Sequence, residues 1–253
     1  VKKEKVEELA KESKIGTEEA GRKLRYSFFE EVADKCKANK IATAHTANDN
    51  AETILMNIIR GTGLSGIKGI EIKRDNKFIR PIIELTRKEI EEYCEEQKLN
   101  PKIDKTNNEN IYTRNKVRNE LIPFIEKEFN PNIITSLNRM SQLVSKEDEY
   151  LEKQVEGAYK EVLIEEYLGN KQLEGNNTII LDLRKFNCEE IVIKNRLVRY
   201  TINILIGSKQ NIEKIHITDI VKLCTNNVVN KFLTPNKNIK VKVGKGKIFF
   251  IKM

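Results

Sequence analysis

The sequence predicts an α/β fold, in which a parallel-sheet domain is followed by a mostly helical second domain with a C-terminal β-hairpin. Two observations predict this fold. A small apolar run at 41–44 precedes an amphipathic helix and a loop with glycines up to Gly69, as in one unit of a parallel sheet. Beyond Pro131 apolar residues follow helical spacing, until an alternating segment at 231–251 turns at Gly244-Lys245-Gly246.

Length, charge and cysteine content limit the classes of protein to which this sequence can belong. A chain of 253 residues is long enough for two domains. Its 46 Lys and Arg against 38 Asp and Glu give a net charge of +8, which favours a polyanionic partner such as nucleic acid. Four separated cysteines without a CxxC pair indicate a reducing compartment and argue against a zinc or iron–sulfur site. Without an apolar run of about 20 residues or a signal sequence, we expect a cytoplasmic protein with no membrane contact.

Residues 1–37 are predicted to be helical. A packing stripe is formed by residues that recur at helical spacing: Ala20, Leu24, Phe28, Val32 and either Cys36 or Ala33. The opposite side carries three polar or aromatic residues, whose pattern alone favours a solvated face: Arg22, Arg25 and Tyr26.

The segment 41–69 carries the first group of candidate functional residues. His45 follows the strand at its carboxyl end, where open α/β sheets bind ligands, and Asn48 or Asp49 can cap the next helix. One helix face is apolar, with Ala51, Ile54, Leu55 and Ile58, and the other carries Asp49, Glu52, Thr53 and Arg60. Glycines that let the backbone approach a ligand follow, among them Gly61 and Gly63. Spacing alone leaves a binding site and a solvated face equally supported.

A hairpin around residues 74–76 is predicted next, and then a helix over 88–97. Thr86 and Glu89 form the capping box of that helix, which turns Ile90, Tyr93 and Cys94 inward. A polar loop at 106–108 leads to a compact basic group that either binds phosphates or is a solvated helix start: Tyr112, Arg114, Asn115, Lys116 and Arg118.

The C-terminal half is predicted as a long helix over 132–168, a connector over 169–180 ending in a strand at 178–181, and helices at 189–205 and 216–224. His216 has no neighbouring ligand types and is interpreted as structural. The lysines of the tail either contact RNA phosphates or protect edge strands: Lys237, Lys240, Lys242, Lys245 and Lys247.

Two motifs resemble those of the tRNA(Ile)-lysidine synthases, within the N-type ATP pyrophosphatase (PP-loop) superfamily. The first is AHTANDNAET followed by RGTGLSGI, in which Thr46, Asn48 and Asn50 depart from the usual family pattern AHHxDDQAET. The second is DKTNNENIYTRNKVRNELIP, at 104–123, and EEAGRKLRYSFF upstream also resembles the family. The resemblance implies a partial Rossmann-like sheet domain of the adenine nucleotide alpha hydrolase type.

The resemblance also implies an activity and roles for residues. Such enzymes adenylate C2 of the wobble cytidine of tRNA(Ile) with ATP and magnesium, and the amine of free lysine then displaces AMP. It places Asp49 and Glu52 at the magnesium or the lysine amine, with Asp49 as the metal ligand, and His45 and Arg60 at phosphate. Gly61 and Gly63 would contact the nucleotide. Arg114, Asn115 and Arg118 would contact the tRNA backbone or complete the active-site wall. Arg22 and Arg25 would bind phosphate of the RNA or have a structural role. A homodimer is compatible with it.

The family's phosphate loop, SGGxDS, does not occur in this sequence. We therefore expect residues 1–122 to be the C-terminal part of a catalytic domain, 123–168 a linker helix and 169–253 a tRNA-binding α+β domain, with 1–253 incomplete for catalysis. Two alternatives are a catalytically inactive tRNA-binding fragment and another PP-loop tRNA-modifying enzyme, such as a thiolation enzyme. The second is disfavoured because paired cysteines are absent.

Overall fold

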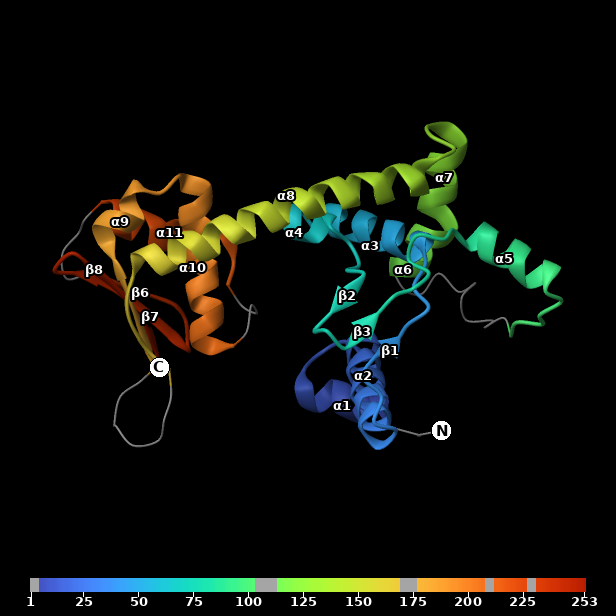
Figure 1. Cartoon of the computed structure of the whole chain (residues 1–253), viewed down its shortest axis with the longest axis horizontal. Helices are drawn as coiled ribbons and strands as arrows, with labels where there is room; N and C mark the ends of the chain where they lie inside the picture. Colours follow the sequence, from blue (N-terminus) through green and yellow to red (C-terminus); the bar gives the residue numbers. More distant parts are fainter. Residues whose placement is uncertain (1–4, 103–112, 169–176, 208–211, 227–230) are drawn as a thin grey trace. The chain divides into compact units, whose positions relative to one another are not determined.

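The computed structural model describes residues 5–102, 113–168, 177–207, 212–226 and 231–253 (Figure 1). The chain divides into two compact units, Val1–Ser145 and Lys146–Met253, which are described separately. The predicted loop at 106–108, the predicted contact residue Tyr112 and most of the connector before Thr178 lie outside the described residues.

Unit 1 begins with two helices, α1 (Val6–Ser13) and α2 (Thr17–Lys35), which confirms the helical prediction for this region. Ala20 and Ala33 are buried, whereas Val32 is 39% exposed and does not complete the expected stripe. Tyr26 is only half-exposed, because its ring packs 5.0 Å from that of Phe78, measured between centroids.

The sheet of unit 1 has three short strands in the order β1 (Ile41–Ala42), β3 (Phe78–Ile79) and β2 (Lys73–Arg74). β1 and β3 are parallel, as predicted for the strand before His45, and β2 pairs antiparallel with β3. The predicted hairpin is confirmed. Asp75 and Asn76 both have positive φ at its turn, a backbone conformation that Asp and Asn tolerate well.

Helix α3 (Ala47–Ile59) is N-capped by Thr46, so the prediction of Asn48 or Asp49 as its cap is wrong. The Thr46 hydroxyl accepts from the Asp49 N–H at 3.3 Å, and Asp49 Oδ2 accepts from the Thr46 N–H at 2.8 Å. This reciprocal pair satisfies two backbone donors, which neither Asn48 nor Asp49 does alone. Asn48 Oδ1 instead accepts from the N–H of Arg87, 2.8 Å away.

The apolar face of α3 packs on the first part of α8 (Ile133–Val162). Ala51 and Ile54 are fully buried and contact Leu137, whereas Ile58 is 46% exposed. After α3 come α4 (Leu64–Ile67) and α5 (Arg87–Glu96). The capping box of α5 is confirmed, but Tyr93 is 59% exposed and does not point inward as predicted.

The basic segment forms one continuous helical stretch. It consists of α6 (Thr113–Lys116), a π-helical turn η2 (Val117–Leu121) and α7 (Ile122–Glu128). Both α6 and η2 pack against α3. Residues of the second sequence motif therefore lie beside residues of the first.

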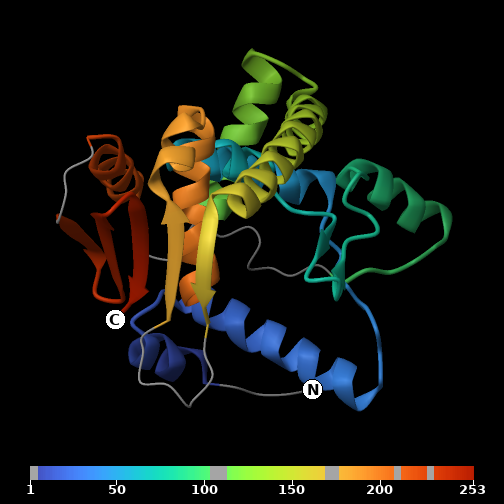
Figure 2. The same ribbon diagram turned by 60° about the vertical axis from the view of Figure 1, so that its left-hand side comes forward.

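Unit 2 holds a five-stranded antiparallel sheet in the order β4-β5-β8-β7-β6, whose strands lie side by side in Figure 2. Its strands are β4 (Leu163–Tyr167), β5 (Thr178–Asp182), β6 (Phe232–Asn236), β7 (Ile239–Gly244) and β8 (Lys247–Lys252). Helices α9 (Leu183–Cys188), α10 (Ile191–Ile206) and α11 (Lys214–Thr225) pack on the sheet around a core that includes Ile179, Leu197 and Phe250.

Two predictions for unit 2 need correction. The long helix ends at Val162 and not at 168, because the following residues pair with β5 as strand β4. The C-terminal hairpin β7–β8 is confirmed, but it is the interior of a larger sheet, so Lys240, Lys242 and Lys247 do not lie on edge strands. In the part of the chain that is described, no helix has the length and apolar character to cross a bilayer.

Candidate anion-binding site

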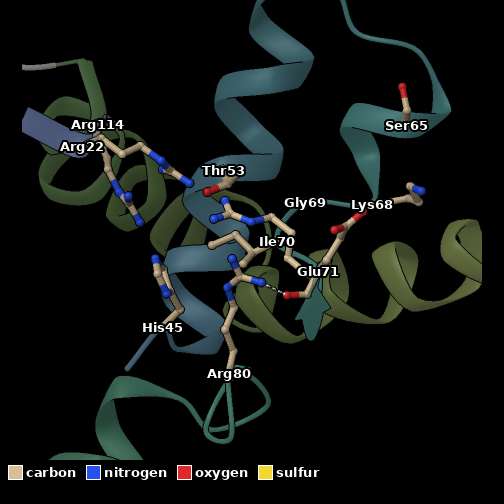
Figure 3. Close-up of a pocket in the computed structure, with 11 residues that line it drawn as sticks. Arg22, His45, Thr53, Ser65, Lys68, Gly69, Ile70, Glu71, Arg80 and Arg114 are labelled. Atoms are coloured by element: carbon tan, nitrogen blue, oxygen red, sulfur yellow. Dashed lines mark hydrogen bonds between the residues drawn. The ribbon is translucent and has the colours of Figure 1, made fainter. Parts of the chain in front are cut away.

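A pocket of about 210 Å³ opens in unit 1 beside the carboxyl end of β1. The labelled side chains of Arg22, His45, Arg80 and Arg114 extend toward the same space in Figure 3. Five of its lining residues carry a positive charge and one a negative charge. The complete lining comprises Arg22, His45, Thr53, Ser65, Lys68, Gly69, Ile70, Glu71, Arg74, Arg80 and Arg114. Such an excess of cations in a concave site favours an anionic ligand.

Arg80 is the most buried cation of the pocket, with 4% of the residue exposed. One of its Nη atoms donates to the backbone carbonyl of Glu71. Its Nε is buried and, among the described residues, has no hydrogen-bond partner. A buried guanidinium with an unused donor is costly unless an anion completes it, so Arg80 makes the pocket a candidate anion-binding site.

Beside the pocket lies an arginine–carboxylate cluster of Asp49, Glu52, Arg114 and Arg118. Arg114 donates from Nε to Glu52 at 2.7 Å and from Nη2 to Asp49 at 2.8 Å. Arg118 donates from Nε to Glu52 at 2.6 Å and from Nη2 to Asp49 at 3.1 Å. The structure thus brings together four residues that the two motifs singled out separately.

Burial explains why the cluster needs both arginines. The Glu52 side chain is 1% exposed, and a carboxylate so deeply buried requires compensating positive charge. The hydrogen bond to Glu52 is also the main reason that the pKa of Arg118 is raised. The predicted polar stripe of α3 is therefore not a solvated face at Glu52.

The carboxylate oxygens of Asp49 are engaged in this conformation. Oδ1 accepts from both arginines, and Oδ2 accepts from the N–H and hydroxyl of Thr46. Among the residues that the structure describes, no three His, Cys, Asp or Glu side chains are grouped to hold a metal ion. These residues do not by themselves form a magnesium site.

His45 has its Nδ1 3.0 Å from the hydroxyl of Thr43. Burial is the main cause that lowers the pKa of His45, and the neighbouring Arg80, Arg114 and Arg22 lower it further against the opposing effect of Asp49. The lowered pKa favours the neutral form of the imidazole. A neutral ring beside the pocket offers hydrogen bonding without adding charge.

Other predicted site residues lie apart from the pocket. Arg60 is exposed at the C-terminal end of α3, about 16 Å along the helix from Asp49. Gly61, with φ of +77°, and Gly63 follow that end, and neither lines the pocket. Arg25 is exposed on α2, and Asn115 is half-buried on α6. Their predicted roles stay predictions.

Sequence reasoning missed Lys68, Arg74 and Arg80 as pocket residues. An arginine inside the otherwise apolar run FIRPII was the available signal for Arg80, because a charge in a buried segment requires a partner. Lys68 and Arg74 gave no comparable signal, since lysine and arginine in loops and turns are ordinarily solvated.

Comparison with known proteins agrees with this fold. Residues 1–125 match the PP-loop domain family, which makes this part of the chain a PP-loop domain. The chain is 46% identical over 227 residues to the tRNA(Ile)-lysidine synthase of Clostridioides difficile, with 90% of this chain and 47% of that protein covered. It is also 46% identical to that of Clostridium acetobutylicum (95% and 50% covered) and 44% identical to that of Clostridium perfringens strain 13 (88% and 45% covered).

The chain is therefore a homologue of the tRNA(Ile)-lysidine synthases over most of its length. It spans about half the length of the curated relatives that it matches.

Proposed function

We propose that this chain functions in an ATP-dependent ligase that joins lysine to C2 of the wobble cytidine of tRNA(Ile) through an adenylated intermediate. The observation that carries the proposal is the cationic pocket with Arg80 buried in it, built within a PP-loop domain whose relatives are tRNA(Ile)-lysidine synthases. The negative charge of a nucleoside triphosphate complements the positive charge of this pocket.

In this reaction the C2 oxygen of cytidine attacks the α-phosphate of ATP and pyrophosphate leaves. The amine of lysine then attacks C2 and AMP leaves. Arg22 and Arg80 are suited to bind phosphate oxygens, because they line one pocket and guanidinium groups match the geometry of phosphate. Stabilising the charge of the departing pyrophosphate would lower the barrier of the first step.

The two carboxylates of the cluster take different roles in this proposal. Glu52 holds Arg114 and Arg118 in place, since its side chain is almost inaccessible. Asp49, whose side chain is 20% exposed, is the carboxylate that the lysine amine could reach. Magnesium, when bound with ATP, would neutralise phosphate charge.

Arg114 and Arg118 fit the wall of the active site better than a contact with the tRNA backbone. Both guanidinium groups are engaged by carboxylates, which offsets the charge that a phosphate contact requires. A homodimer and a cytoplasmic location stay predictions.

The test is incorporation of labelled lysine into a tRNA(Ile) transcript by the gene product that carries this chain. We expect incorporation that requires ATP, and none into a transcript whose wobble cytidine is replaced by uridine. Binding of tRNA without incorporation would favour the inactive tRNA-binding protein. Sulfur transfer to tRNA would favour the thiolation enzyme.

A further inference from the structure

Two hydrogen-bonded side-chain amides lie behind the anion pocket, the buried Asn50 and the half-buried Asn138. The Ile70 N–H donates to Oδ1 of Asn50 at 2.6 Å, and Nδ2 of Asn50 donates to Oδ1 of Asn138 at 2.8 Å. Nδ2 of Asn138 in turn donates to the carbonyl of Ala47 at 2.9 Å. We call these hydrogen bonds, from Ile70 through Asn50 and Asn138 to Ala47, the amide relay. The relay runs from the pocket wall, through α3, to the first part of α8.

The direction of this relay is fixed by the backbone. The Ile70 N–H is a donor only, so it must face the oxygen of Asn50 and not its NH₂ group. At the other end Asn138 meets two backbone carbonyls, of Ala47 and Ile134, which accept from its NH₂ group. Each amide thus has one orientation that satisfies all of its partners.

The relay is hydrogen-bonded to a segment that lines the pocket. Lys68, Gly69, Ile70 and Glu71 are consecutive lining residues, and the Glu71 carbonyl accepts from Arg80. The Lys68 carbonyl is also bound, by the hydroxyl of Ser141 on α8 at 2.6 Å. Asn50, which binds Ile70, and Ser141, which binds Lys68, both lie outside the pocket lining.

Close packing makes this attachment specific. Asn50 is 5% exposed, and a Cβ on residue 69 would clash with its Oδ1. Gly69 also has φ of +65°, which glycine adopts without strain. An amide that fills this space can be replaced by neither a larger nor an apolar side chain without moving the wall.

We propose that Asn50, oriented by Asn138, is a positioning residue that sets the anion affinity of the pocket by fixing the wall from Lys68 to Glu71. Through the Glu71 carbonyl this wall also holds the buried guanidinium of Arg80. The inference rests on the proposed function only in taking the ligand to be a phosphate compound.

The test uses Asn138→Leu, which lies outside the pocket lining, in the gene product that carries this chain. The matched control is Leu137→Ala, one residue away on α8, which opens a cavity beside Ala51 and Ile54 but leaves the relay intact. Hydrogen exchange of the Ile70 amide and the affinity for inorganic pyrophosphate are measured for both, with the melting temperature.

We expect Asn138→Leu to speed exchange at Ile70 and to weaken pyrophosphate binding, each about tenfold. Leu137→Ala should lower the melting temperature as much or more and change neither quantity. Asn50→Leu should reproduce the effect of Asn138→Leu.

Unchanged exchange at Ile70 in Asn138→Leu would overturn the inference, and so would faster exchange with unchanged pyrophosphate affinity. Equal effects of the control would show general destabilisation and would overturn it as well. Failure of the proposed function is seen separately, as wild-type protein that binds pyrophosphate but attaches no lysine to tRNA.

Discussion

The Nε atom of Arg118 donates a 2.6 Å hydrogen bond to Oε1 of Glu52 and so joins the π-helical turn η2 to the centre of α3. These residues are 66 positions apart in the chain. Because Glu52 is almost fully buried, the pair is an interior contact between the two sequence motifs and not a solvent-exposed salt bridge.

Replacing Glu52 by Gln should therefore destabilise unit 1. The change removes one of the two carboxylates that neutralise Arg114 and Arg118 and leaves Asp49 to compensate both, which costs about 3 kcal/mol in the free energy of unfolding. Urea denaturation measures this change in the free energy of unfolding. The control is Glu91→Gln, which breaks the exposed pair with Arg87 and should give no resolvable change. Equal stability of the wild type and Glu52→Gln would contradict a structural role for this pair.

Acid should destabilise the protein through His45. Its pKa is lowered in the folded state, mainly by burial, so the unfolded chain binds a proton more readily. The stability due to the neutral ring is present above the ordinary pKa of about 6.5 and is lost as the pH falls toward the folded value. We expect the wild type to lose more free energy of unfolding than His45→Asn between about pH 7.5 and about pH 5.5. Identical losses would exclude His45 as the cause.

Thiol reactivity should separate the cysteines. Burial raises the pKa of the Cys224 thiol to about 12, whereas Cys36 and Cys188 are exposed. Because the thiolate is the reactive form, iodoacetamide should label Cys36 and Cys188 in the native protein and Cys224 only after unfolding. Peptide mass spectrometry reads the sites. Labelling of Cys224 as fast as Cys36 would show that the core of unit 2 opens readily.

Lysines on the open side of the unit 2 sheet should contribute to tRNA binding. Strand register places Phe232, Lys242 and Phe249 in one row, and the Lys240 ammonium lies 4.3 Å from the Phe232 ring centroid. Aromatic rings beside lysines suit unpaired nucleotides.

Alanine at Lys240, Lys242 and Lys247 should weaken tRNA binding and lower the slope of log affinity against log salt by up to about three. A control variant, with alanine at Lys214 and Lys222 on α11, should leave the slope unchanged. Equal slopes for all three proteins would place the RNA contact elsewhere.

Local chemistry in the sequence predicted much of this fold. The capping box at Thr86, the hairpin turn at Asp75-Asn76 and the turn at Gly244–Gly246 each depend on residues close together in the chain, and each is confirmed. The segment 163–167 was predicted as helix because its residues fit one, and only pairing with β5 makes it a strand. Local propensity cannot report a partner that lies elsewhere in the chain.

The site was less accessible to sequence reasoning for the same reason. Asp49 and Glu52 were identifiable from their motif, but their pairing with Arg114 and Arg118 spans more than 60 residues. The partner of Asn50 is 88 positions away, and nothing near Asn138 marks it. Arg80 became a candidate only when its burial and its unused donor were visible.

Helix α2 offers a matched pair of arginines that tests the pocket itself. Arg22 lines the pocket and Arg25, three residues further on, does not. Removing a charged donor to an anion costs about 1.5–3 kcal/mol, so Arg22→Gln should weaken pyrophosphate binding at least about tenfold. Arg25→Gln removes the same charge from the same helix and should leave the affinity nearly unchanged. Isothermal titration calorimetry at fixed ionic strength measures both. Equal weakening would mean that the net charge of the unit attracts the anion; no effect of either change would place the phosphate compound outside this pocket.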